Sequence, residues 1–202
     1  AAASAPVAVF GNAGQDCCAR SRILVQSGVF DEFLSLMEPA VTGMRVGDPF
    51  DEATDMGPLI SADHREKVAS YVPDDAPVAI RGDAPEGAGF WYPPTVLAPV
   101  DNRDRAAQEE IFGPVVAVIP FEDEEDAVRL ANDTVYGLSG SVWTQNVARA
   151  MRVARRIETA HQQLTATLGR TPTPTELAHT LGIAVDELKA VDDDVQRAVV
   201  LS

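Results

Sequence analysis

The sequence predicts an α/β fold followed by an all-α helical tail. Two compact apolar runs, at residues 23–25 and 115–119, have the length and composition of buried strands. The first is followed by residues 29–41, whose apolar side chains recur at helical intervals, and the second by residues 122–131, which begin with an acidic helical turn. A strand followed by a helix is the repeating unit of α/β folds. After residue 145 the patterns are helical throughout.

The other elements of the first 143 residues are shorter. Residues 1–9 are compatible with a helix that ends as the chain enters a glycine turn at residues 11–14. Pro93 and Pro94 cannot donate to a sheet ladder, so residues 92–97 are expected to form an edge strand. The remaining assignments are a turn at 48–55, a polar helix at 62–71, a strand at 78–80, a loop at 83–89 and a strand at 137–143.

A long helix is predicted to join the α/β part to the tail. Across residues 145–168 apolar side chains recur every three or four positions, and Gly169 then ends the helix. The two predicted domains, residues 1–159 and 160–202, share this helix.

Composition and charge limit the possible partners. The 202 residues carry 16 basic and 31 acidic side chains, a net charge of −15, which disfavours binding to nucleic acid or to an anionic membrane. No run is long and apolar enough to span a bilayer. Two adjacent cysteines cannot form a disulfide framework, which indicates an intracellular, cytoplasmic protein. The chain does not begin with Met, which suggests a fragment or a processed chain.

No metal site is assigned from the sequence. His64, His161 and His179 are not spaced as metal ligands with either cysteine, and surface or helix-packing roles are expected for them. The acidic run at residues 122–126 fits a solvated helix start better than a cation site.

The most informative run is the thiol-bearing turn at residues 10–22. It places Cys17 and Cys18 after a glycine-flanked turn and directly before an apolar strand. A catalytic thiol works as the thiolate, which needs partial access and a positive field, and the freed backbone amides together with Arg20 and Arg22 are expected to supply that field. The ordinary alternative for a Cys-Cys pair is that both are small buried apolar residues.

This run, Phe-x-Asn-x-Gly-Gln-x-Cys-x-Ala-x-Ser-Arg, resembles the active-site cysteine signature of the NAD(P)-dependent aldehyde dehydrogenase superfamily. Further segments resemble that family in the same order, and the resemblance extends from residue 1 to about residue 159. They are Gly-Asp-Pro at 47–49, Met-Gly-Pro-Leu-Ile at 56–60, Tyr-Pro-Pro-Thr-Val-Leu at 92–97, Glu-Glu-Ile-Phe-Gly-Pro-Val at 109–115 and Ala-Asn-Asp-Thr-Val-Tyr-Gly-Leu at 131–138.

The resemblance implies part of the family's catalytic domain, an open doubly wound sheet. It implies that Cys17 is the nucleophile, that Cys18 is structural, and that Glu110 and Phe112 contact the cofactor, which is NAD or NADP. The implied activity is oxidation of a small-molecule aldehyde to a carboxylic acid through a cysteine thiohemiacetal and thioester, and full-length relatives are homo-oligomers. Without the resemblance, Glu110 would be read as a solvated charge and Phe112 as a core residue.

Several parts of the family pattern have no counterpart in these 202 residues. They are the general base in a Glu-Leu-Gly-Gly-Lys-like segment, the asparagine that donates to the oxyanion, and the dinucleotide-binding domain. No glycine-rich phosphate loop replaces that domain in the sequence. The isolated chain is therefore expected to be inactive in aldehyde oxidation.

The tail resembles region 3 of bacterial sigma factors. Thr173, Pro174 and Glu176 form a helix-starting capping box, and a Leu-Gly break at 181–182 precedes a second helix. This pattern leaves two alternatives open, a helical module that binds DNA or RNA polymerase, or a chimeric chain with no combined function. Residues 161–202 carry three basic and six acidic side chains, a net charge of −3, which favours a helical hairpin over DNA binding.

Overall fold

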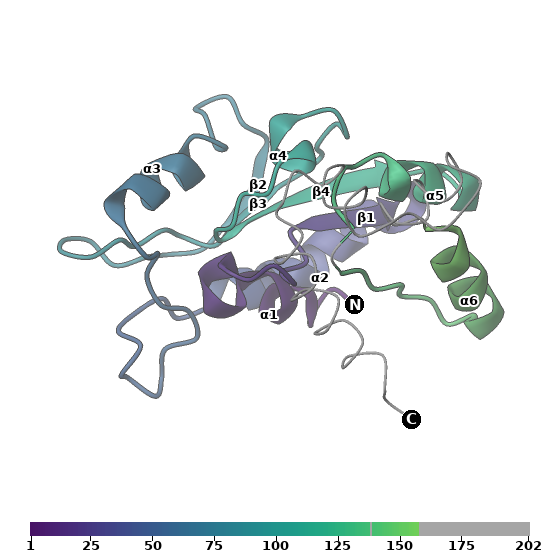
Figure 1. The fold of residues 1–202 in the computed structure, drawn as a ribbon. Helices are drawn as coiled ribbons and strands as arrows, with labels where there is room; N and C mark the ends of the chain where they lie inside the picture. Colours follow the sequence, from purple (N-terminus) through teal and green to yellow (C-terminus); the bar gives the residue numbers. More distant parts are fainter. Residues whose placement is uncertain (138, 158–202) are drawn as a thin grey trace, which may run out of the picture.

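A computed structural model describes residues 1–137 and 139–157 of the chain (Figure 1). Four strands form one mixed sheet in the order β1-β4-β3-β2. Strands β1 (Arg22–Gln26), β4 (Val115–Phe121) and β3 (Thr95–Leu97) are mutually parallel, and β2 (Val78–Arg81) joins the edge in antiparallel orientation. The predicted α/β class is confirmed for the part of the chain that the structure describes.

The centre of the sheet follows from an uninterrupted apolar sequence. Every residue from Val115 to Ile119 in β4 is at most 2% exposed, and parallel pairing with β1 and β3 covers both of its edges. A strand buried on both faces carries a continuous apolar run, because each alternate side chain meets a packed layer. Residues 92–97 do not form the predicted edge strand, since both prolines precede Thr95 and β3 pairs on both sides.

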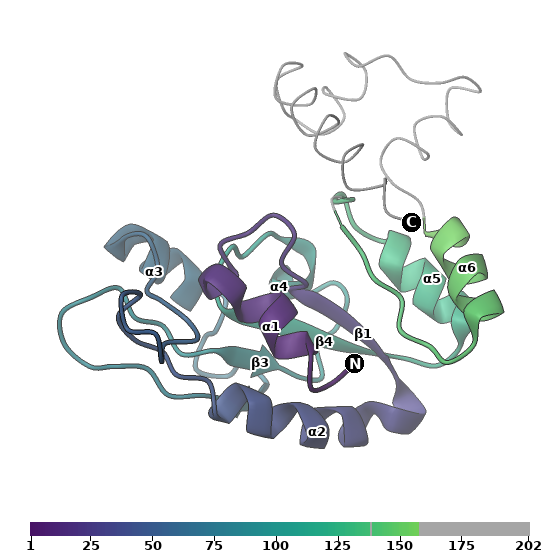
Figure 2. The same ribbon diagram turned by 90° about the horizontal axis from the view of Figure 1, so that it is seen from below.

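Helices α1 (Ala5–Phe10) and α2 (Phe30–Thr42) lie against the sheet. Helix α1 contacts β4 and α2, and α2 contacts β1 and β2. Figure 2 shows α1 and α2 beside the sheet. Phe10 and Met37 are each 0% exposed where these helices meet the core. The remaining described helices are α3 (Ala62–Ala69), α4 (Arg105–Gln108), α5 (Glu124–Asn132) and α6 (Val147–Arg156), with short 3-10 turns η1 (Gly11–Gly14) and η2 (Ser27–Val29).

Helices α5 and α6 are joined by exposed ion pairs. Arg152 pairs with Glu124 at 2.6 Å, and Arg156 pairs with Glu125. Asn132 donates from Nδ2 to the Arg156 carbonyl oxygen at 2.9 Å, which satisfies one of the carbonyl groups left without an intrahelical partner at the end of α6. Ile157 then takes extended backbone, so the described helix ends earlier than the predicted end at residue 168.

Two predicted elements follow residue 136. The predicted strand at residues 137–143 is wrong, because residues 137 and 139–143 form no strand and the side chains from 139 to 143 are exposed without a ladder partner. The predicted tail domain, 160–202, and the later part of the shared helix lie outside the described residues. Along 1–137 and 139–157, no helix has the length and apolar character needed to cross a membrane.

Candidate functional site

The thiol loop is built on three successive residues with left-handed backbone. Asn12, Ala13 and Gly14 have φ values of 51°, 54° and 69°. Left-handed backbone is unfavourable for residues with a Cβ and persists where surrounding contacts enforce it, as at many functional sites. Here Asn12 donates from Nδ2 to the Gln15 carbonyl oxygen at 2.9 Å, and the Gln15 backbone N–H donates back to the Asn12 carbonyl at 3.1 Å.

Gln15 ties the thiol loop to a distant segment of the chain. Its Oε1 accepts from the Ile60 backbone N–H at 2.9 Å, and its Nε2 lies 3.4 Å from the Pro58 carbonyl oxygen. From the sequence, Gln15 had no role beyond its place in the motif. The signal that could have identified Gln15 is the occurrence of two family motifs in the same chain, residues 10–22 and residues 56–60. The side-chain amide of Gln15 in the first motif bonds to the backbone of the second.

A second left-handed loop, at residues 109–114, packs against the first. Phe112 has φ of 57°, and its carbonyl oxygen lies 2.6 Å from Nε2 of His64 on α3. A Cβ added at Gly14 would lie 2.2 Å from the Gly113 carbonyl oxygen, so the two loops meet backbone to backbone. His64 is a positioning residue for this loop that the sequence analysis missed, and no local pattern pointed to it.

The structure places the predicted site residues on these two touching loops. Cys17 and Cys18 are both exposed, which contradicts the alternative that they are buried apolar residues. Glu110 is exposed and Phe112 is half-buried. Glu109 has a separate role, because it accepts from the Tyr71 hydroxyl at 2.8 Å and pairs with Arg105 at 3.0 Å.

The electrostatic setting of Cys17 differs from the expectation. Its sulfur lies 3.9 Å from that of Cys18, and this contact, then burial, then the charge of Asp16 raise the pKa of the Cys17 thiol above its usual value. Arg20 and Arg22 were predicted to place a positive field at the Cys17 sulfur, but both guanidinium groups bond elsewhere. Arg20 donates to the Cys18 carbonyl oxygen, and Arg22 donates to the Asn102 side chain and the Leu130 carbonyl, because its guanidinium turns toward the core side of β1.

The raised pKa predicts a specific pH dependence. We expect alkylation of Cys17 by iodoacetamide to keep accelerating through the alkaline range, because only the thiolate reacts. Cys18→Ala removes the largest cause of the shift and should move the rate profile to lower pH, and Asp16→Asn should move it less in the same direction. Mass spectrometry of the Cys17 peptide measures the rates. An unchanged profile in Cys18→Ala would contradict this origin of the shift.

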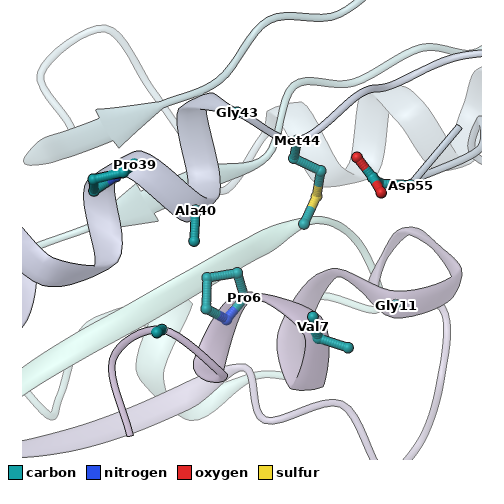
Figure 3. Close-up of a pocket in the computed structure, with 9 residues that line it drawn as sticks. Pro6, Val7, Gly11, Pro39, Ala40, Gly43, Met44 and Asp55 are labelled. Atoms are coloured by element: carbon teal, nitrogen blue, oxygen red, sulfur yellow. The ribbon is translucent and has the colours of Figure 1, made fainter. Parts of the chain in front are cut away.

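An apolar hollow of about 370 Å³ lies between α1 and α2 (Figure 3). Pro6 and Val7 face it from α1, Ala40 from α2, and Met44 and Asp55 close one end. None of the predicted site residues lines it. Gly11, near the start of the thiol-bearing turn, also lines the hollow, but Cys17, Glu110 and Phe112 do not.

Comparison with known proteins gives two family matches. The model described as "Aldehyde dehydrogenase family" matches residues 1–173, and "Sigma-70 region 3" matches residues 152–202. The two ranges overlap at 152–173, which includes the end of α6 and the predicted junction near Ala160.

Individual relatives agree with the first match. The chain is 44% identical to 5-carboxymethyl-2-hydroxymuconate semialdehyde dehydrogenase of Escherichia coli, over 74% of this chain and 34% of that protein. It is 42% identical to geranial dehydrogenase of Castellaniella defragrans, over 77% and 34%. The crystal structure of betaine aldehyde dehydrogenase from Staphylococcus aureus in complex with NAD+ superposes with a TM-score of 0.74 and 39% identity, over 79% and 33%. The chain spans about a third of the length of the relatives it matches.

Proposed function

This chain belongs to the aldehyde dehydrogenase family, and we propose that it carries the nucleophile of an NAD(P)-dependent oxidation of an aldehyde to a carboxylic acid. Cys17 is the proposed nucleophile, and Glu110 and Phe112 are the proposed cofactor contacts. The observation that carries this proposal is the contact between the exposed thiol loop and the loop of Phe112, made through Gly14 and Gly113. It brings an exposed sulfur and two candidate cofactor contacts to neighbouring loops.

The chemistry at Cys17 begins with its thiolate. The sulfur attacks the aldehyde carbon, a C–S bond forms, and the carbonyl π electrons move to the oxygen. The backbone N–H of Cys17 is the proposed donor to that oxyanion. Nicotinamide, when bound, supplies the acceptor for the hydride that leaves the tetrahedral carbon. Water then cleaves the resulting thioester and releases the carboxylic acid and the free thiol.

The residues of the second loop fit part of a nicotinamide cofactor. The exposed carboxylate of Glu110 can accept hydrogen bonds from ribose hydroxyls, and the half-buried ring of Phe112 offers an apolar surface beside them. His64 holds the Phe112 backbone in place through the carbonyl oxygen. Nothing in these residues distinguishes NAD from NADP, because the group that differs lies at the other ribose.

We propose that the 202-residue chain reacts at Cys17 but does not complete the oxidation by itself. The family's general base and asparagine oxyanion donor have no counterpart in the sequence. The sheet of four strands is proposed to be part of the family's open doubly wound catalytic domain. An aldehyde substrate, homo-oligomeric assembly of the complete enzyme and a cytoplasmic location, where thiols stay reduced, complete the proposal.

An activated ester tests the nucleophile without the cofactor. We expect p-nitrophenyl acetate to give a burst of about one acyl group per chain in the wild type and in Cys18→Ala, and none in Cys17→Ala, because acylation needs the attacking thiolate and an oxyanion donor. Mass spectrometry of the acylated peptide locates the group. A burst that survives in Cys17→Ala would overturn the assignment of the nucleophile.

A second arm tests the proposed dependence on the rest of the family's architecture. Small aldehydes with NAD or NADP should give no sustained increase in reduced-nicotinamide absorbance with this chain. Robust turnover that Cys17→Ala abolishes would show that these 202 residues are sufficient for the complete reaction.

A further inference from the structure

We infer that Asp16, Cys17 and Cys18 form a binding site for a thiophilic divalent cation of the Zn²⁺ class. One oxygen of Asp16 and the two sulfurs lie within 4.8 Å of one another, and all three residues are exposed. The site goes beyond the proposed function, since it depends on the geometry of three adjacent residues and not on aldehyde chemistry. We call it the Asp-Cys-Cys site.

The spacing of the sulfurs fits a metal without rearrangement. The two Sγ atoms are 3.9 Å apart. Two Zn–S bonds of about 2.3 Å at a tetrahedral angle place their sulfurs about 3.8 Å apart. A disulfide requires a far shorter sulfur separation, so the observed spacing suits a bridging cation better than a direct bond.

The third ligand is oriented by the backbone. Oδ1 of Asp16 accepts from the Cys18 N–H at 2.8 Å, which holds the carboxylate beside the thiols. Hydrogen bonds of this kind fix the direction of a metal ligand and strengthen binding. Because the residues are exposed, water can occupy the fourth position and the cation can enter from solvent.

The side chain of the arginine nearest in sequence is not bonded to the proposed ligands Asp16, Cys17 Sγ or Cys18 Sγ. The nearby guanidinium of Arg20 donates to the Cys18 carbonyl oxygen, so the arginine is directed to the backbone. Binding releases two protons: M²⁺ and two thiols give a dithiolate complex and two H⁺, with no change of oxidation state. Thiolate ligands select Zn²⁺ over Mg²⁺, which prefers oxygen ligands.

Occupation of the site blocks the Cys17 sulfur. The lone pair that would attack an electrophile is then bound to the metal, so Zn²⁺ and an alkylating reagent compete for the same atom. Because two protons leave, the apparent affinity rises with pH.

Titration of the reduced chain with Zn²⁺ alone tests the site. We expect one equivalent to bind by calorimetry, to protect both cysteines from iodoacetamide, and to be unmatched by Mg²⁺. Cys18→Ser and Asp16→Asn should weaken binding by at least about tenfold, the usual effect of removing a ligand or its support. Asp48→Asn is the matched control, because Asp48 makes the same side-chain turn, with Oδ1 accepting from the Phe50 N–H at 2.9 Å, but has no thiol beside it.

The outcomes separate this site from the proposed function. Unprotected Cys17 at saturating Zn²⁺, or equal loss of affinity in Asp16→Asn and Asp48→Asn, overturns the Asp-Cys-Cys site and leaves the ester burst intact. Zn²⁺ binding that depends on both cysteines, together with no burst at Cys17, supports the metal site and removes the nucleophile. Circular dichroism confirms that each variant is folded.

Discussion

We expect replacement of Gly14 by alanine to lower the free energy of unfolding by roughly 2–5 kcal/mol. Two costs add at this position. The residue has φ of 69°, where a Cβ strains the backbone, and the new Cβ would lie 2.2 Å from the Gly113 carbonyl oxygen. The contact partner is backbone, so it cannot rotate away as a flexible side chain could. Urea denaturation followed by circular dichroism measures the loss.

Two other glycines separate these costs. Gly11 has φ of −49° and no atom within 4 Å of an added Cβ, so Gly11→Ala should change stability by less than about 1 kcal/mol. Gly87 has φ of 93° and equally open space, so Gly87→Ala should show the conformational cost alone, about 1–3 kcal/mol. The excess of Gly14→Ala over Gly87→Ala then reports the contact between the two loops. Equal effects in all three variants would mean that the loops do not touch.

Loop contact also links Gly14 to the reactivity of the thiol. If Gly113 and Gly14 are forced apart, the Gln15 bridge to Ile60 and the left-handed turn before Cys17 lose their support. Gly14→Ala is therefore expected to lose the ester burst even under conditions where the chain remains folded.

The strands and helices of the sheet region could be predicted where a local residue pattern reflects burial or helix capping. Residues 115–119 form an unbroken apolar run because β4 is buried on both faces, and the helix at 122–131 was marked by its acidic first turn, where Asp123 caps the Asp126 N–H at 2.9 Å. Whether residues 92–97 form an edge strand or an inner strand depends on which strands pair with β3. Strand pairing is set by contacts between residues far apart in the sequence, so the local pattern could not decide it. The strand expected at 137–143 needed a ladder partner, which no local pattern can supply.

The site shows the same division. The glycine turn followed from local residue types. The exposed thiol followed from the family resemblance, because the Cys-Cys pair alone left open whether the two side chains are buried. Gln15 and His64 could not be assigned in this way, because their partners lie 45 and 48 residues away in the sequence. Arg20 and Arg22 were assigned to the thiolate because they are close to Cys17 in the sequence. Sequence distance does not fix where a side chain points, and the guanidinium of Arg22 points to Asn102 and Leu130.

Arg22 gives the clearest test of this difference between sequence distance and side-chain direction. We expect Arg22→Met to lower the free energy of unfolding by roughly 1–3 kcal/mol, because the buried Asn102 side-chain oxygen loses the donor that Arg22 supplies. The Leu130 carbonyl also loses the Arg22 donor but keeps a hydrogen bond from the Asp133 backbone N–H at 3.2 Å. Burial lowers the pKa of the Arg22 guanidinium, and the charge of Asp133 opposes that shift. Methionine keeps the length of the side chain, so the loss reports the hydrogen bonds more than the packing. Chemical denaturation provides the measurement.

Arg20→Met is the control, because Arg20 lies in the same segment and its side chain donates to the carbonyl oxygen of the exposed Cys18. It should change stability by no more than about 0.5 kcal/mol. The two variants also distinguish two roles for Arg22: a structural role through its hydrogen bonds, and the predicted role of supplying a positive field to the Cys17 thiolate. If its guanidinium stabilised the thiolate, Arg22→Met would slow alkylation of Cys17 in the folded chain. Since the guanidinium faces Asn102 and Leu130 instead, we expect the alkylation rate under native conditions to stay within about twofold of the wild type, which corresponds to roughly 0.4 kcal/mol.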